Sequence, residues 1–345
     1  MPQKYDVMAG SDHTSVNTRS STQQLEVDDN LPKTTSEYAD QLTVYTKSLS
    51  SGAGERYLGQ IENGRRYHKF REGCYLLPND EKENERLDIH HALVTCAVMD
   101  NKLFLSPIEN PKHAIDLCTG TGIWAIQFAD IFPDCEVIGN DLSPTQPSLV
   151  PPNLQFIIDD VESDWVYEET PFDFIHARYL AEAIRDMPRL LQQAYNCLKP
   201  GGWIEFQDWD THPYSIDGSI KGTGIEQFYD VVLNAFIKQG FYTHPGRDLE
   251  NWFIDAGFVN VHVKKYRVPL GSWAKGEKNK QAGAYNLMQY EEAIEGGALA
   301  VLTRYENWTP EEVQVLVAKA RADARRPDVH VLFDFYVVWG QKPEK

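Results

Sequence analysis

A glycine-containing turn and a later acidic residue form the part of the chain best suited to bind a ligand. The turn reads DLCTGTGIWA over residues 116–125, and Asp141 follows in the run VIGNDLSP. Gly120 and Gly122 allow backbone amides to approach a ligand, and a helix beginning near Ile123 points its positive end at the same place. An acidic side chain about 20 residues later is placed to bond a ribose diol. The pattern predicts a nucleotide-type ligand on a βαβ unit.

The glycines fit a nicotinamide dinucleotide as well as S-adenosylmethionine, and three further features separate the two. Asp116 precedes the glycines, where a carboxylate suits an ammonium group and repels a diphosphate. The run IIDDV ends a predicted strand with Asp160 and Val161, an acceptor and an apolar side chain suited to an adenine edge and face. The run LKPGGWI, residues 198–204, predicts a tight turn that leads into a strand. Together these features favour S-adenosylmethionine.

As a set, these motifs resemble the class I S-adenosylmethionine-dependent methyltransferases. More narrowly, the chain is similar to the fungal LaeA-like methyltransferases in the runs ENGRRYHKFREGCYLLPNDEKENERLDIHH, VIGNDLSPTQP, IDDVESDW, FDFIHARYL, VPLGSW and YVVWGQKP. The resemblance covers residues 55–343. It implies an α/β, Rossmann-like fold with a seven-stranded, mostly parallel sheet whose last strand is antiparallel, an N-terminal helical segment and a helical cap.

The resemblance also implies roles for individual residues around the cofactor. It assigns Asp116, Gly120 and Gly122 to the methionine end and Asp141 to the ribose. Further positions follow in the same way: Leu142 under the adenine, Asp160 and Val161 at the adenine edge and face, His176 and Arg178 near the sulfonium, and Tyr75 against the cofactor. Cys118 departs from the family pattern because it stands where a glycine is usual, which predicts tighter packing near the methionine moiety.

Histidines are the candidate catalytic bases, since methyl transfer to a hydroxyl needs a positioned nucleophile and a proton acceptor. His176 ends a predicted strand on the cofactor side and titrates near neutrality, so it is the first candidate. His212 is the second, and His244 is a weaker third. A structural hydrogen bond is the alternative role for each. The run His176-Ala177-Arg178 stands where a metal-dependent mechanism would need an acidic cluster, so no metal is expected.

Candidate substrate contacts lie on both sides of the nucleotide-binding segment. In related enzymes the segment that carries Tyr57, Tyr67 and His68 folds over the pocket. Trp209 and His244 are the candidates from the later part of the chain. Ordinary packing in a lid or core is the alternative interpretation of these side chains.

Strand-like and helix-like runs alternate from residue 113 to residue 208, which predicts a parallel sheet with helical crossovers. The expected parts are a disordered polar tail (1–45), a helical lid segment (46–110), a cofactor-binding core (111–267), a helical cap (268–328) and a final strand of the core (329–345). The basic run 65–71 is interpreted first as a solvated helix face and second as part of a site.

Charge and composition exclude several classes of protein. The net charge of −18 opposes a polyphosphate backbone, so no direct contact with nucleic acid is expected. The five cysteines form no C-x-x-C pair, which fits a reducing compartment. No long apolar run or secretory leader is found, so we expect no membrane contact and a cytoplasmic or nuclear location.

Three functions remain open. The leading one is an enzyme that methylates a small molecule, a fungal secondary metabolite, with O-methylation favoured over N or S, because the cap is large enough to enclose a pocket. The second is a LaeA-like regulatory methyltransferase that works with velvet-domain partners in the control of secondary metabolism or development. The third is a protein that binds the cofactor without methylating. A homodimer through the N-terminal helices is also compatible with the resemblance.

Overall fold

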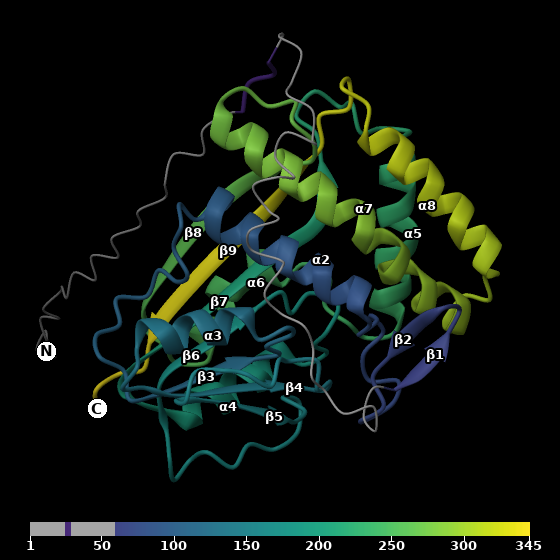
Figure 1. Ribbon diagram of the computed structural model, residues 1–345. Coiled ribbons are helices and arrows are strands. Elements are labelled where there is room, and N and C mark those ends of the chain that lie inside the picture. Colours follow the sequence, from purple (N-terminus) through teal and green to yellow (C-terminus); the bar gives the residue numbers. More distant parts are fainter. Residues whose placement is uncertain (1–24, 29–58) are drawn as a thin grey trace, which may run out of the picture.

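A seven-stranded sheet with the order β5-β4-β3-β6-β7-β9-β8 forms the centre of the computed structural model, which describes residues 25–28 and 59–345 (Figure 1). β9 runs antiparallel to both of its neighbours, and the other pairs of adjacent strands are parallel. This confirms the predicted fold class. The strands are β3 (His113–Leu117), β4 (Glu136–Asp141), β5 (Leu154–Ile158), β6 (Phe172–Arg178), β7 (Leu198–Tyr214), β8 (Val259–Pro269) and β9 (Leu332–Gln341).

Helices cover both faces of the sheet, so successive residues of the central strands β3 and β6 are buried on both sides. On one face α3 (Ile123–Ile131) packs Trp124 and Phe128 against Phe174 of β6. On the other face α4 (Met187–Cys197) and α6 (Pro245–Asp255) enclose a second apolar cluster. The carboxyl ends of β3, β4 and β6 therefore meet at one edge, where the predicted cofactor residues stand.

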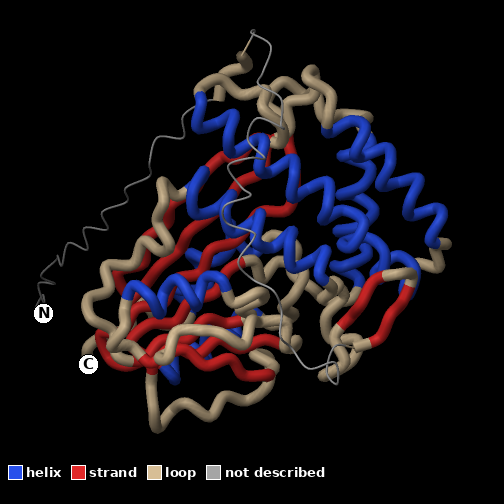
Figure 2. The backbone as a smooth tube through the Cα atoms, viewed as in Figure 1, coloured by secondary structure: helices blue, strands red, loops and turns tan. Residues whose placement is uncertain are grey.

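A helical cap contacts the sheet at β7 and β8. It extends to the right-hand side of Figure 1, and Figure 2 shows its helices in blue. Its helices pack on one another in one apolar cluster. They are α2 (Glu81–Ala92) with the π-helical turn η2 (Leu93–Val98), α5 (Gly224–Lys238), α7 (Glu277–Tyr305) and α8 (Pro310–Ala324). α5 contacts both α7 and α8. The cap thus includes a helix from within the segment 111–267 that we had expected to form the core.

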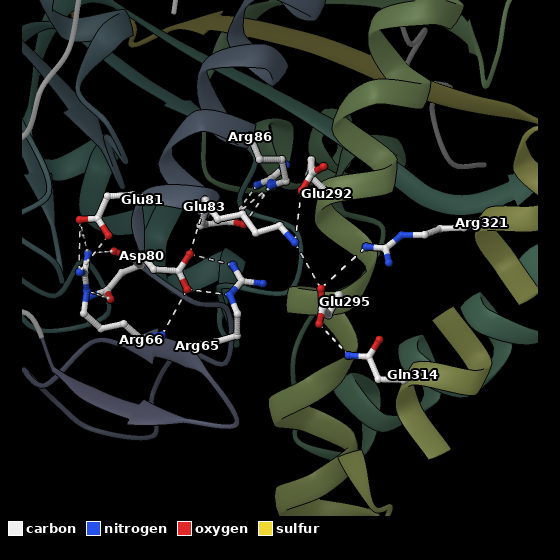
Figure 3. Close-up of polar contacts among 12 residues, drawn as sticks. Arg65, Arg66, Asp80, Glu81, Glu83, Arg86, Glu292, Glu295, Gln314 and Arg321 are labelled. Atoms are coloured by element: carbon white, nitrogen blue, oxygen red, sulfur yellow. Dashed lines mark hydrogen bonds and ion pairs between the residues drawn. The ribbon is translucent and has the colours of Figure 1, made fainter. Parts of the chain in front are cut away.

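A hairpin, β1 (Gln60–Glu62) and β2 (Arg65–Tyr67), precedes α2. The interpretation of the basic run as a solvated helix face is therefore wrong. Asn63 and Gly64 have φ values of 50° and 78°, which suit a two-residue hairpin turn. Arg65 is buried and donates to both oxygens of Asp80, at 2.7 and 2.9 Å. Asp80 in turn caps α2 by accepting from the Glu83 amide (Figure 3).

Ion pairs join the start of α2 to the cap helices (Figure 3). Lys82 lies 3.3 Å from both Glu292 and Glu295 of α7, and Glu295 accepts from Gln314 of α8 at 2.6 Å. Exposed pairs of this kind each contribute little to stability, so the apolar cluster rather than the charges holds the cap together. No helix in the described residues is long and apolar enough to cross a membrane.

The predicted N-terminal tail lies outside the described residues, except for residues 25–28. Val27 forms an antiparallel bridge with Ala274, so this short part of the tail is paired with the body of the protein. Tyr57 also lies outside the described residues.

Candidate functional site

The turn after β3 begins the site, and three of its residues have a left-handed backbone conformation. Cys118, Gly120 and Gly122 have φ values of 52°, 60° and 79°. The Asn140 side chain accepts from the Cys118 amide at 3.2 Å, and the Asn140 carbonyl accepts from the Thr119 amide at 2.8 Å. A non-glycine residue at positive φ is strained, so Cys118 is held in a conformation that a glycine would adopt freely.

The two central glycines of this loop have different surroundings. A Cβ atom on Gly120 would meet only Leu87, at 3.5 Å, so the space above Gly120 is open. A Cβ atom on Gly122 would lie 2.3 Å from Cζ of Phe156. Gly122 is therefore required by packing against the sheet and does not line the cavity, in contrast to its predicted contact with the cofactor.

A histidine–aspartate pair lies below the loop. Asp116 and His176 are register partners on β3 and β6, and the Asp116 carboxylate is 2.7 Å from Nδ1 of His176. The other Asp116 oxygen accepts from the Thr119 hydroxyl at 2.5 Å. The His176 ring is fully buried and stacks on Trp124 with ring centroids 3.7 Å apart. Burial lowers the pKa of His176 to about 4, against the opposing effect of Asp116, so the ring is neutral.

Asp141 ends β4 and faces the loop. One carboxylate oxygen accepts from the Gly120 amide at 2.9 Å, and the other accepts from the Ser143 amide at 2.9 Å. Burial raises the pKa of Asp141 to about 6, while these amide bonds act in the opposite direction. The carboxylate is thus fixed in orientation and keeps lone pairs for a further donor.

Asp160 and Val161 follow β5 on the same side of the site. Asp160 accepts from the Glu162 amide at 2.9 Å and is paired with Arg71 at 3.1 Å. Val161 is buried beside it. The basic segment after the hairpin thus contributes one ion pair to the rim of the site through Arg71.

Arg178 brings a positive charge to the end of β6. Its Nε donates to Gln207 at 2.8 Å, and its terminal nitrogen lies 3.0 Å from Nδ1 of His91. His91 must accept from Arg178, so its Nε2 carries the proton and donates to Gln127. Burial lowers the pKa of Arg178 to about 10 and that of His91 to about 3. Near neutral pH the guanidinium is therefore charged and the imidazole is neutral.

These groups surround one cavity, which we call the cofactor cavity. It contains about 1060 Å³ of non-atom space, including the solvent at its mouth. The structure brings ten of the eleven predicted cofactor residues together in its wall: Tyr75, Asp116, Cys118, Gly120, Asp141, Leu142, Asp160, Val161, His176 and Arg178. In the described part of the chain no group of three acidic, cysteine or histidine side chains could hold a metal ion.

Most of the predicted catalytic and substrate residues lie elsewhere. His212 and His244 form an edge-to-face ring pair with centroids 5.0 Å apart, and neither lines the cofactor cavity. Tyr67 and His68 are buried next to the hairpin, where the Arg304 guanidinium lies over the Tyr67 ring. Trp209 is buried and donates from its indole nitrogen to Nε2 of His90 at 2.8 Å. These residues share no common pocket.

Two smaller cavities adjoin the cofactor cavity beneath the cap. We call the larger one the inner chamber; it contains about 480 Å³ of non-atom space, including its mouth, and its wall includes Arg86, Tyr179, Glu182, Phe228 and Tyr229. The side cavity has His90, Trp209 and Asn286 in its wall. Tyr179 lines all three cavities, and His90 lines the cofactor and side cavities.

Sequence reasoning missed His90, His91, Tyr179 and Glu182. The two histidines lie on α2, within the segment 46–110 that we had expected to form a helical lid. Tyr179 directly follows Arg178 in the run FDFIHARYL, so its position after a strand end was the available signal. Nothing local marks Glu182, because its cavity neighbours come from α2, α5 and α7.

The chain matches the family described as "Methyltransferase domain" over residues 90–263. It is 41% identical over 299 residues to "Methyltransferase pytC" of Aspergillus terreus, covering 86% of this chain and 91% of the relative. It is 34% identical over 297 residues to "Protein-methionine methyltransferase laeA" of Emericella nidulans, covering 86% of this chain and 79% of the relative. A solved phosphoethanolamine N-methyltransferase 2 of Haemonchus contortus with S-adenosyl-L-methionine is 18% identical with a TM-score of 0.43, covering 79% of this chain and 54% of that chain.

Proposed function

Because the chain belongs to the S-adenosylmethionine-dependent methyltransferases, we propose that it transfers a methyl group to a hydroxyl of a small molecule held beneath the helical cap. The observation that carries this proposal is the junction of cavities at Tyr179. Tyr179 contributes to the walls of the cofactor cavity, the inner chamber and the side cavity. Cavities of this size next to the cofactor cavity suit a small-molecule acceptor.

Charges in the cofactor cavity match the charges of a zwitterionic amino-acid group. Asp116 would hold the ammonium end, and the open space above Gly120 leaves room for the methionine moiety. We assign Arg178 to the carboxylate rather than to the sulfonium, because a guanidinium repels a second positive charge and pairs strongly with a carboxylate. Asp141 would accept from the ribose diol, while Asp160 and Val161 would hold the adenine. S-adenosylmethionine supplies an electrophilic methyl group.

We propose a positioning role for His176 instead of the catalytic role expected from the sequence. Its side chain is fully buried, and its Nδ1 is committed to Asp116, which leaves Nε2 without a hydrogen-bond partner among the described residues. A base must reach the proton that it removes, and the His176 ring, although it contributes to the cavity wall, has no exposed surface and is held between Trp124 and Asp116. His176 instead holds the Asp116 carboxylate in place. His212 does not line the cofactor cavity.

The competing proposal is a protein acceptor and a regulatory role, as in a LaeA-like methyltransferase that acts with velvet-domain partners. It is supported by the similarity to the relatives named for protein-methionine methylation and for regulation of secondary metabolism. A protein side chain would have to enter by the mouth of the cofactor cavity and would leave the inner chamber unused. Transfer of labelled methyl groups to methionines of the protein itself or of a velvet-domain protein would favour this alternative.

Calorimetric titration with S-adenosylmethionine and S-adenosylhomocysteine tests the cofactor site. Saturable binding is expected for the wild type and for Asp134→Ala, whose side chain is 91% exposed. Asp141→Ala is expected to lose most of this affinity. A panel of phenols, acids, thiols and amines with labelled S-adenosylmethionine then tests the acceptor class. Cofactor binding without any methylated small molecule would contradict the proposed function.

A further inference from the structure

A short strained segment connects the cofactor cavity to the inner chamber. Tyr179 and Glu182 have φ values of 62° and 61°, although neither is a glycine. Conformations of this kind are strained and persist only where surrounding contacts fix them. Two such residues lie within four positions directly after β6. Contacts around this segment therefore fix the directions of its side chains.

Backbone hydrogen bonds hold the segment at every position. The Tyr179 amide donates to the Gln207 carbonyl at 3.0 Å, and the Glu182 amide donates to the Tyr242 carbonyl at 2.7 Å. Between them, the amides of residues 180 and 181 donate to the Asp208 carboxylate at 2.7 and 3.4 Å. As a result, Tyr179 and Glu182 face the inner chamber. The next two residues, Ala183 and Ile184, line the cofactor cavity.

The inner chamber places the Glu182 carboxyl group among mostly apolar neighbours. Its wall includes Phe228, Val232 and Phe236 of α5 and Ile294 of α7. Burial raises the pKa of Glu182 to about 7, and the nearby Asp208 carboxylate acts in the same direction. Arg86 and a hydrogen bond from Thr211 oppose this rise. The carboxyl group can therefore gain and lose a proton near neutral pH.

The other charges of the inner chamber are paired with each other (Figure 3). Arg86 donates to Glu83 at 2.6 Å and to Gln289 at 3.2 Å, and its guanidinium lies 5.4 Å from the centre of the Tyr179 ring. The Arg86–Glu83 pair is thus internally neutralised and fixes one face of Tyr179. His90 stacks on Tyr179 with ring centroids 4.8 Å apart. The aromatic rings and the Glu182 carboxyl group suit a ligand that is flat, mostly apolar and hydroxylated.

We propose that the inner chamber binds an aromatic alcohol and that Glu182 accepts the proton of its hydroxyl group during methyl transfer. This inference rests on the proposed function. The hydroxyl oxygen forms a bond to the transferred methyl carbon, the carbon–sulfur bond breaks, and sulfur keeps that electron pair as a thioether. The hydroxyl proton moves to the Glu182 carboxylate. A phenol is the favoured class because its pKa of about 10 is far closer to that of Glu182 than the pKa of an aliphatic alcohol.

Two probes test the assignment, and they differ only in that a methyl group replaces the hydroxyl proton in one of them. The full-length protein is saturated with S-adenosylhomocysteine and titrated with 2-naphthol or with 2-methoxynaphthalene, following probe fluorescence. Glu182→Gln keeps the shape of the side chain, and Glu182→Gly fits the left-handed backbone and removes the carboxyl group. Glu85→Gln, on the exposed face of α2, is the matched control.

Wild type and Glu85→Gln are expected to bind both probes saturably. Both Glu182 variants should bind 2-naphthol about tenfold or more weakly, with little change for the methyl ether. The initial rate of methyl transfer from S-adenosylmethionine to 2-naphthol should fall at least about 100-fold in Glu182→Gln.

Equal effects on both probes, unchanged affinity for 2-naphthol, or a transfer rate within threefold of wild type would overturn the role of Glu182. Absence of 2-naphthol binding or transfer by a wild-type protein that binds S-adenosylhomocysteine would overturn the assignment of the chamber to aromatic alcohols. Failure to bind S-adenosylhomocysteine would instead contradict the proposed function itself.

Discussion

Protonation of Asp141 should weaken cofactor binding while it stabilises the free protein. Asp141 is the proposed partner of the ribose diol, and burial raises its pKa from 3.8 to about 6. Ligand hydroxyls bond a charged acceptor more strongly than a neutral one, by about 1–2 kcal/mol. Lowering the pH from about 8 to about 5 should therefore raise the Kd for S-adenosylhomocysteine about fivefold to thirtyfold.

The stability of the free protein should change in the opposite direction. Because the pKa of Asp141 is higher in the folded state than in the unfolded chain, the folded state binds more protons between about pH 6 and about pH 4. The stabilisation is complete below the unfolded pKa and is lost as the pH rises through about 6. The rise of about two pKa units corresponds to roughly 3 kcal/mol at most.

Calorimetry over this pH range on wild type and Asp141→Asn tests whether cofactor binding weakens and whether the free protein becomes more stable as the pH falls. Asp141→Asn should bind more weakly at pH 8 and lose most of the pH dependence. Asp88 provides the control, since burial raises its pKa to about 6 as well, but it accepts from the Thr121 hydroxyl and does not line the cofactor cavity. Asp88→Asn should therefore keep the pH dependence of binding. Equal pH dependence in wild type and Asp141→Asn would refute the assigned role of the Asp141 carboxylate.

Three further predictions concern the same cavity. Gly120→Ala and Gly122→Ala both place a Cβ at positive φ, so each should lower the free energy of unfolding by about 1–2 kcal/mol. Gly122→Ala should lose about 1–3 kcal/mol more, because its Cβ would lie 2.3 Å from Phe156, whereas Gly120→Ala should also weaken cofactor binding. Denaturant unfolding and calorimetry distinguish the two variants, and equal losses of stability would contradict the packing difference. Cys118→Gly should change the free energy of unfolding by less than about 1 kcal/mol. Glycine removes the strain of the positive φ, and this gain offsets the greater freedom of the unfolded chain. A loss above about 2 kcal/mol would show that the thiol is needed for packing. Arg178→Met should weaken the binding of S-adenosylmethionine about tenfold or more. The affinity for 5′-methylthioadenosine, which lacks the carboxylate, should not change. Equal losses of affinity for both ligands would contradict the pairing of Arg178 with the carboxylate.

Local patterns were enough to predict residues that line one cavity. A strand followed by a glycine turn, an acid after the next strand and a polar end to the third strand all depend on neighbouring residues in the chain. Asp116, Asp141 and Asp160 therefore came together as expected, since parallel strands end at one edge of the sheet. The antiparallel β9 was also predicted, although its insertion between β7 and β8 was not.

The same patterns failed where the direction of a side chain mattered. Gly120 and Gly122 look equivalent in the sequence, yet Phe156 of a distant strand fills the space beside one and leaves the other open. His212 and His244 look like catalytic histidines, but they pair with each other outside the cavity. The basic run 65–71 contains a hairpin because Asn63 and Gly64 form its turn and Arg65 is buried against Asp80.

Periodicity and turn chemistry act over a few residues, so the sheet, the cofactor class and the residues at the strand ends could be predicted from the chain alone. The surroundings of Tyr179 and Glu182 could not, because they depend on how distant segments pack. The inner chamber forms where α2, α5 and α7 pack together; α2 ends at residue 92, whereas α5 begins at residue 224 and α7 at residue 277. Contacts over such separations depend on the shape of the whole core, which no local pattern of residues encodes.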